Sequence, residues 1–370
     1  MPPPHSSVRS DPGQRSVIPA LTGLRIVAAL AVVAFHLREE PLAGLLPGLA
    51  QQLDFAVYGG LGVDLFFTLS GFILSLNYLD AFARLRRRAL VRFLCMRLAR
   101  IYPVHVVTLL AMVVIVAVTP EVATTASGGE VYSAEAFVAN VFLVQAWGTS
   151  DFTWNYPAWS ISAEWFAYLV FPFLAFVMCR WGLARATWAY AGLVVTVVGG
   201  IAALATSAGS GFEPLIRVAT EFSTGCLLYV LHRETPLGQG LAAGARLAVI
   251  LAASIVLTVA LDGNLYTLAP ALALVIWGIA RTRGPLARLL SSRSMVFGGE
   301  ASYALYMTHV VVITALSHLL PTADYTHEQL FIRIAVTGVY VASIAVVALL
   351  TYKYVERPAR RWIRRQLSSD

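Results

Sequence analysis

Residues 18–37 form an apolar stretch that is long enough to cross a lipid bilayer as a helix, yet it contains Arg25 and His36. An α-helix advances about 100° and 1.5 Å per residue, so these two side chains share one helix face and lie roughly 16 Å apart along the axis. A charged group inside a membrane costs on the order of 3 kcal/mol, so such residues usually face the protein interior and mark a functional site. The stretch therefore predicts a membrane helix whose polar face turns toward other helices.

The rest of the chain has the composition of an integral membrane protein. Hydrophobic residues make up 58% of it and charged residues 13%, whereas a soluble domain has about 25% charged residues. The apolar residues fall into blocks of membrane-spanning length, which predicts an all-α, polytopic membrane helical bundle. The net charge of +7 does not indicate nucleic-acid binding, because Lys and Arg cluster at the ends of apolar blocks, where they set topology. We therefore expect a multi-pass protein of the cell inner (plasma) membrane, in contact with the lipid bilayer and with no nucleic-acid partner.

About ten crossings are expected. They are, by residue number, 18–37, 58–79, 101–118, 157–179, 187–205, 215–231, 247–261, 265–279, 296–318 and 332–354. The densest basic run, interpreted as a loop at residues 83–100, is placed in the cytoplasm by the positive-inside rule, which gives an N-in, C-in topology. Residues 136–147 are apolar but too short to cross, so we expect them to be re-entrant or interfacial.

This topology divides the chain into three parts. Residues 1–16 are expected to be a disordered cytoplasmic N-terminus, 17–356 the membrane domain, and 357–370 a basic cytoplasmic tail.

Three ionisable residues from different expected spans, His36, Asp64 and Glu164, lie in the outer half of the membrane. A buried histidine needs a hydrogen-bond partner, and a neighbouring carboxylate would orient the ring and raise its basicity, as a general base requires. The sequence does not show which carboxylate is the partner. A proton path through a transporter or flippase would need the same groups, so the enzyme and the transporter both remain open here. These acids and histidines lack metal-ligand spacing, so no metal is expected.

Other polar residues share helix faces with one another. Ser160 and Tyr168 lie on the face of Glu164, and Tyr306 and His309 follow Ser302 at helical spacing. Small and hydroxylated residues in membrane helices are mostly packing surface.

A further pair of opposite charges lies in the expected span 215–231. Arg217 and Glu221 are placed to pair one turn apart on the same helix.

Six motifs together resemble those of the integral-membrane acyltransferase-3 family, and they occur in the family's order along nearly the whole chain. They are Arg25 followed by His36, GVDLFFTLSGFIL at 62–74, Arg97 and Arg100 leading into Ile101-Tyr102-Pro103, WSISAEWFAYLVFP at 159–172, SYALYMTH at 302–309, and Glu356-Arg357-Pro358. The family includes bacterial O-acetyltransferases of surface polysaccharides and acyltransferases that modify macrolide antibiotics.

The resemblance implies an acyltransferase that transfers a group other than an aminoacyl group. An acyl group, expected to be acetyl, would move from cytoplasmic acyl-CoA to a hydroxyl of a cell-envelope glycan, a glycolipid or a macrolide-like secondary metabolite. Arg97 and Arg100, together with Arg25, would hold the donor, and two guanidiniums one helical turn apart can fork onto phosphates.

The same resemblance implies that His36 is the essential histidine, acting as the base with Asp64 or Glu164 beside it. Some members carry a second acid directly after the Glu164 equivalent, where this chain has Trp165. Further candidate site residues are Ser160, Tyr168, Tyr306, His309 and Glu356.

Overall fold

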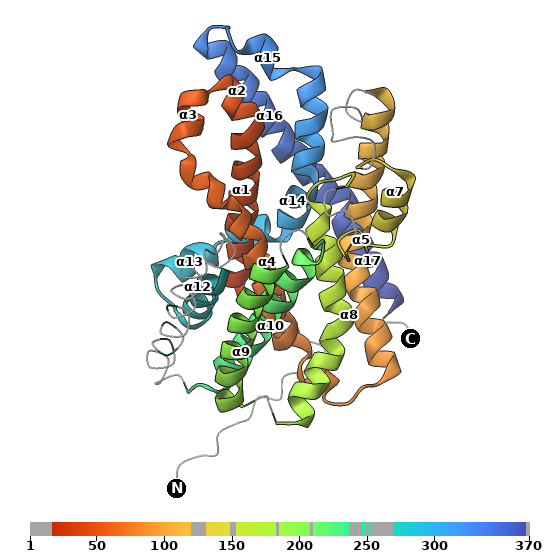
Figure 1. The fold of residues 1–370 in the computed structure, drawn as a ribbon, viewed down its shortest axis with the longest axis vertical. Coiled ribbons are helices and arrows are strands. Elements are labelled where there is room, and N and C mark those ends of the chain that lie inside the picture. Colours follow the sequence, from red (N-terminus) through yellow and green to blue (C-terminus); the bar gives the residue numbers. More distant parts are fainter. Residues whose placement is uncertain are drawn as a thin grey trace.

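The computed structural model describes residues 17–119, 131–148, 153–182, 185–207, 210–236 and 269–367, together with residues 244, 246, 248 and 252. Figure 1 shows these residues as a bundle of long helices. The long helices are α1 (Pro19–Leu37), α4 (Leu61–Tyr78), α5 (Arg87–Val118), α8 (Ala158–Arg180), α9 (Ala186–Thr206), α10 (Glu213–Glu234), α14 (Arg293–Leu319) and α16 (Leu330–Thr351). The prediction of an all-helical membrane bundle is confirmed.

Eight helices in the described part of the chain are long and apolar enough to cross a membrane. Each corresponds to one of the spans expected from the sequence. The N-terminal residues 1–16 and, apart from residues 248 and 252, the expected span 247–261 fall outside the described residues. The expected span 265–279 is represented from residue 269 by the shorter helix α12 (Ala269–Arg281). The number of crossings and the N-in, C-in orientation therefore stay predictions.

The basic run at 83–100 was expected to be a loop, but only residues 83–86 are non-helical, so that interpretation was wrong for the rest of the run. From Arg87 onward it is the first half of α5, a helix of 32 residues and so about 48 Å in length. Phe93, Arg97 and Ile101 follow one another at four-residue spacing and are all buried in the bundle. The run is helical because this buried stripe continues the stripe of the apolar half of the helix.

Shorter helices connect or extend the long ones. They are α2 (Ala43–Leu45), α3 (Pro47–Gln52), α7 (Ala134–Val141), α13 (Pro285–Leu290), α15 (Thr322–Tyr325) and α17 (Arg357–Gln366). Helix α7 overlaps the segment 136–147, which was expected not to cross the membrane. With 8 residues, α7 is too short to cross. A single π-helical turn, Tyr352–Glu356, joins α16 directly to α17, so the expected tail begins as a continuation of the last long helix.

Helix α1 packs against α4, α13 and α14 and thereby holds its polar face inside the bundle. The approach of α14 is very close, because a Cβ placed on Gly299 would lie 1.8 Å from the carbonyl oxygen of Thr22. Only glycine allows the two backbones to come this near.

Helices α4 and α10 form a second close crossing. A Cβ on Gly71 would lie 2.0 Å from the carbonyl oxygen of Phe222, and a Cβ on Gly225 would lie 2.0 Å from that of Thr68. Each helix therefore contributes one glycine that admits the backbone of the other. The contact places Asp64, on the same face as Thr68 and one turn earlier, beside the first half of α10.

Candidate active site

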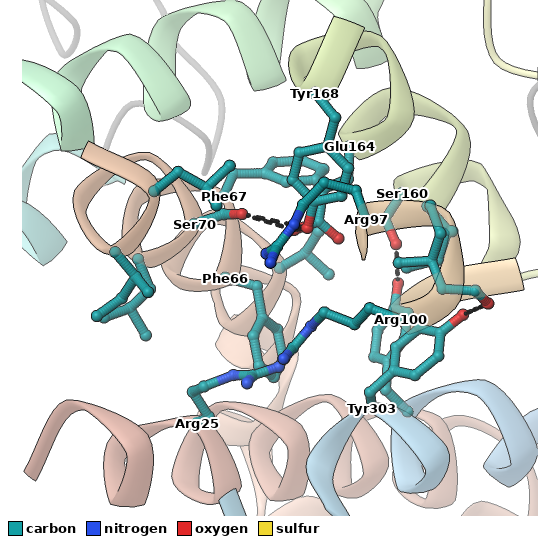
Figure 2. Close-up of a pocket in the computed structure, with 17 residues that line it drawn as sticks. Arg25, Phe66, Phe67, Ser70, Arg97, Arg100, Ser160, Glu164, Tyr168 and Tyr303 are labelled. Carbon is teal, nitrogen blue, oxygen red and sulfur yellow. Dashed lines mark hydrogen bonds between the residues drawn. The ribbon is translucent and has the colours of Figure 1, made fainter. Parts of the chain in front are cut away.

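A polar cavity lies where α1, α4, α5, α8 and α14 meet (Figure 2). Its polar lining consists of Arg25, Ser70, Arg97, Arg100, Ser160, Glu164, Tyr168, Tyr303 and Tyr306. The cavity volume is about 100 Å³. Because one water needs about 10–15 Å³ on this measure, the cavity has room for several waters or for one slender, flexible chain.

Glu164 is the acid of this cavity. Its Oε1 accepts hydrogen bonds from Ser70 Oγ at 2.7 Å and from the Tyr168 hydroxyl at 2.5 Å. Figure 2 shows Glu164 of α8, Arg25 of α1 and both Arg97 and Arg100 of α5 reaching into one space. No ion pair within 4.0 Å joins Glu164 to any of these arginines in the described part of the chain. The carboxylate therefore balances their charge across the cavity rather than neutralising one of them by contact.

Arg97 is a buried cation held mainly by aromatic rings. Its guanidinium carbon lies 5.5 Å from the ring centre of Tyr78, 5.7 Å from that of Phe93 and 5.9 Å from that of Tyr168. Arg97 is only 8% exposed, and its Nε has no hydrogen-bond partner among the described residues. A buried guanidinium with an unused donor and no paired carboxylate is suited to bind an anionic ligand.

A second, open cleft adjoins the cavity at α5. It is lined by Met96, Arg97, Ala99, Arg100, Glu300, Tyr352, Arg357, Arg360, Arg361 and Arg364. Arg97 and Arg100 line both spaces, so the cleft and the cavity meet at these two side chains. Glu356 lies just beneath this cleft, fully buried, and accepts a hydrogen bond from Arg360 at 3.2 Å.

His36 lies at the end of α1 and contacts a second histidine. Its Nδ1 is 3.0 Å from the carbonyl oxygen of Val32 and 3.2 Å from Nε2 of His309. A carbonyl oxygen can only accept, so the neutral ring is assigned its proton on Nδ1. Nε2 of His36 then carries a lone pair, and this buried atom has no protein partner among the described residues. A histidine in this state is arranged to accept a proton from a ligand.

Tyr306 connects the cavity to the histidine pair. It lines the cavity, its hydroxyl is 2.7 Å from Ser160 Oγ, and its ring centre is 5.8 Å from that of His309. Tyr156 covers His36 from another side, with ring centres 5.5 Å apart. The open cleft, the cavity and the histidine pair are thus a series of neighbouring features, linked first by Arg97 and Arg100 and then by Tyr306.

Asp64 is not part of this series. Its Oδ1 accepts hydrogen bonds from Nη2 of Arg217 at 2.6 Å and from Nε of Arg217 at 3.1 Å. The guanidinium carbon of Arg217 lies 5.0 Å from the ring centre of Trp159. The expected pair of Arg217 and Glu221 is present at 3.9 Å, and the closer partner of Arg217 is Asp64 from another helix.

The expected cluster of His36, Asp64 and Glu164 is therefore divided among three places in the structure. No hydrogen bond joins His36 to either acid in the described ranges, and the neighbours of its ring are His309 and the Val32 carbonyl. Equal depth in the membrane did not place these side chains on facing sides of their helices.

Two polar residues that line the cavity were not anticipated from the sequence. Ser70 lies off the polar stripe of its helix that contains Asp64, so helical spacing gave no signal for it. Tyr303 directly follows Ser302 in one of the motifs, and its hydroxyl donates to the carbonyl oxygen of Ile101 at 2.5 Å. Within the described residues, no group of three or more His, Cys, Asp or Glu side chains is placed to hold a metal ion.

Comparison with known proteins identifies the family. The family model of the acyltransferase 3 group, described as an acyltransferase domain, matches residues 18–353. Acyltransferase MdmB of Streptomyces mycarofaciens is 29% identical over 94% of this chain and 93% of its own length. Peptidoglycan O-acetyltransferase OatA of Listeria monocytogenes is 23% identical over 94% of this chain, and the chain spans 56% of its length. A putative O-acetyltransferase of Staphylococcus aureus, SACOL0978, is also 23% identical, over 93% of this chain and 57% of its own.

No solved structure matches the chain. The match of one family model to almost the entire membrane bundle is nevertheless decisive, and it agrees with the polytopic architecture. The chain is a multi-pass membrane protein that belongs to the acyltransferase 3 family and is an acyltransferase.

Proposed function

We propose that this acyltransferase takes an acyl group, expected to be acetyl, from acyl-CoA on the cytoplasmic side and transfers it to a hydroxyl of an envelope glycan, a glycolipid or a hydrophobic secondary metabolite. The observation that carries the proposal is the open basic cleft that shares Arg97 and Arg100 with a narrow cavity, whose Tyr306 contacts His309 beside His36. The phosphates of CoA suit the guanidiniums, and its slender pantetheine arm suits the cavity.

His36 is the proposed general base. Its Nε2 takes the proton of the acceptor hydroxyl as the oxygen attacks the thioester carbonyl. The carbon–sulfur bond then breaks, and the leaving thiolate takes the proton from the imidazolium, which restores the starting state. His309 acts as a positioning residue, because its contact with Nδ1 fixes the ring so that Nε2 is left for the hydroxyl.

Glu164 and Arg25 have electrostatic roles in this proposal. Three guanidiniums facing one cavity would repel one another. The carboxylate of Glu164, held by Ser70 and Tyr168, offsets that repulsion while the donor site is empty. Arg25 lies over the ring of Phe66, 5.7 Å from its centre, at the side of the cavity formed by α1. It is placed to contact the donor arm or its thioester oxygen.

The proposal is tested with protein purified in detergent and radiolabelled acetyl-CoA. Envelope glycans, lipids and secondary metabolites of the host serve as acceptor pools, and mass spectrometry identifies the product that gains an acetyl group. A general base contributes about 10²- to 10⁴-fold, so His36→Ala should reduce transfer on that order while the protein elutes as wild type in size-exclusion chromatography.

The matched control is His318→Ala. His318 lies on α14 and is exposed, and among the described residues its ring bonds only the Thr314 carbonyl of its own helix. This variant should therefore retain wild-type transfer. Full transfer by His36→Ala would end the proposed mechanism.

The transporter alternative predicts no acyl transfer by protein in detergent, where no membrane separates two compartments. Family membership favours the enzyme, and the same assay separates the two.

A further inference from the structure

Helix α17 carries a face of arginines that line the open cleft. Arg357, Arg360, Arg361 and Arg364 line the cleft and follow one another at positions i, i+3, i+4 and i+7, which places them within about 100° of one another around the helix. Trp362, at 63% exposure, lies on a different face of the same helix. The four arginines therefore point to one side of the helix. A topology signal depends on their number near the membrane and does not require a common face.

The position of α17 is fixed by buried contacts. Glu356, in the π-helical turn before α17, is fully buried and ion-paired to Arg360, and the Tyr352 hydroxyl donates to Glu300 Oε2 at 2.7 Å. Helix α17 also packs along α5, which carries the two arginines shared with the cavity. The cleft is thus a built site, with six guanidiniums and the single carboxylate of Glu300 in its lining.

The two sets of arginines lie at different distances from the cavity. Arg97 and Arg100 line both the cleft and the cavity, whereas the arginines of α17 line the cleft alone. In CoA, the thiol arm is followed by the diphosphate and then by the adenosine ribose with its 3′-phosphate. If the arm enters the cavity, the diphosphate reaches the shared pair first, and the 3′-phosphate extends beyond it into the cleft.

We infer that the arginine face of α17 binds the 3′-phosphate of the CoA donor and makes the enzyme discriminate CoA thioesters from carriers that lack this phosphate. The inference rests on the proposed acyl-CoA donor and adds a second anion position to it. Carriers of the excluded kind are 3′-dephospho-CoA, pantetheine, and phosphopantetheine attached to a carrier protein. A phosphate group on a lipid headgroup offers the same chemistry to these arginines, so the test includes a lipid arm.

The test measures binding, because no acceptor is then needed. Isothermal titration calorimetry on the full chain in neutral detergent gives the Kd of CoA and of 3′-dephospho-CoA. A charge-assisted contact to a phosphate should make CoA bind roughly tenfold to a hundredfold more tightly than the dephospho compound. In Arg361→Gln/Arg364→Gln, that ratio should fall toward one.

Arg365→Gln is the control for the loss of charge. It removes one arginine from the same helix but not from the cleft lining, so the wild-type ratio of the two Kd values should persist. Arg361 and Arg364 are exposed, so their substitution leaves the buried core of the bundle untouched, and size-exclusion chromatography of each variant checks the fold.

Three results would overturn the inference. Equal Kd values for CoA and 3′-dephospho-CoA in wild type would refute the role of α17 but leave acyl-CoA as the donor. Equal Kd values combined with variant-sensitive binding to phosphatidylglycerol vesicles would assign the arginine face to lipid headgroups instead. No binding of CoA at all would refute the proposed donor and, with it, the inference.

Discussion

Removing the charge of Arg217 should destabilise the bundle more than removing the charge of Asp64, although the two form one ion pair. Arg217 donates to Asp64 at 2.6 Å and lies 3.9 Å from Glu221, and the three side chains are 7%, 0% and 6% exposed. Arg217 is therefore one cation between two buried carboxylates. The two substitutions leave very different sets of charges behind.

The magnitudes follow from what remains buried. Arg217→Met leaves two carboxylates without a cation, and removing one partner of a buried ion pair costs about 3–5 kcal/mol. Asp64→Asn leaves Arg217 beside Glu221, one helical turn along α10. The distance between these two charged groups, now 3.9 Å, can then shorten. The loss is then mainly a charged hydrogen bond, about 1–3 kcal/mol. The double variant Asp64→Asn/Glu221→Gln leaves Arg217 buried without either carboxylate. Its free energy of unfolding should again fall by about 3–5 kcal/mol.

The assay is equilibrium unfolding of each variant in mixed micelles, together with acetyl transfer per folded molecule. We expect Asp64→Asn to retain most of its transfer, because Asp64 contacts Arg217 rather than the cavity or His36. Two results would refute this reasoning. One is a loss of stability in Asp64→Asn as large as that in Arg217→Met. The other is lost transfer in a fully stable Asp64→Asn protein, which would restore Asp64 as a catalytic residue.

Three further predictions concern the donor site, the packing and the topology. Arg97→Lys/Arg100→Lys should insert normally but raise the KM for acetyl-CoA about tenfold or more, since lysine loses the forked phosphate contact; an unchanged KM would contradict this. Gly71→Ala should destabilise the bundle by about 1–3 kcal/mol, measured by unfolding, because the new Cβ would lie 2.0 Å from a carbonyl oxygen of α10; wild-type stability would mean that the helices separate freely. In a cysteine-free background, Ala323→Cys should react with an impermeant thiol reagent added outside intact cells and Ser291→Cys should not, and the opposite pattern would reverse the orientation.

The sequence predicts the long helices well because each is an apolar block of membrane length, and hydropathy depends on composition alone. It failed for residues 87–100, which were expected to be a loop and are helical. Arg97 is instead buried among the rings of Tyr78, Phe93 and Tyr168. Cation–π contacts come from the approach of other helices, and residue spacing within one helix does not reveal them.

The site shows the same limit. Sequence position fixes how deep a side chain lies, but which helices are neighbours and how each is rotated depend on tertiary packing. For that reason the expected partner of His36 was an acid at similar depth, and the observed partner is His309 of α14. The family resemblance had already singled out His309, since it lies in the motif SYALYMTH, but its role could not be read from one helix.

The crossing of α4 and α10 determines which parts of this enzyme are free to move during turnover. Its reciprocal glycines set the level at which the two backbones meet, and Asp64 ties the same helices together seven residues from Gly71. Sliding one helix past the other by a turn, about 5.4 Å, would strand buried charges and drive side chains against carbonyl oxygens. The pair is therefore a fixed frame, and any closure around the donor has to come from helices outside this crossing.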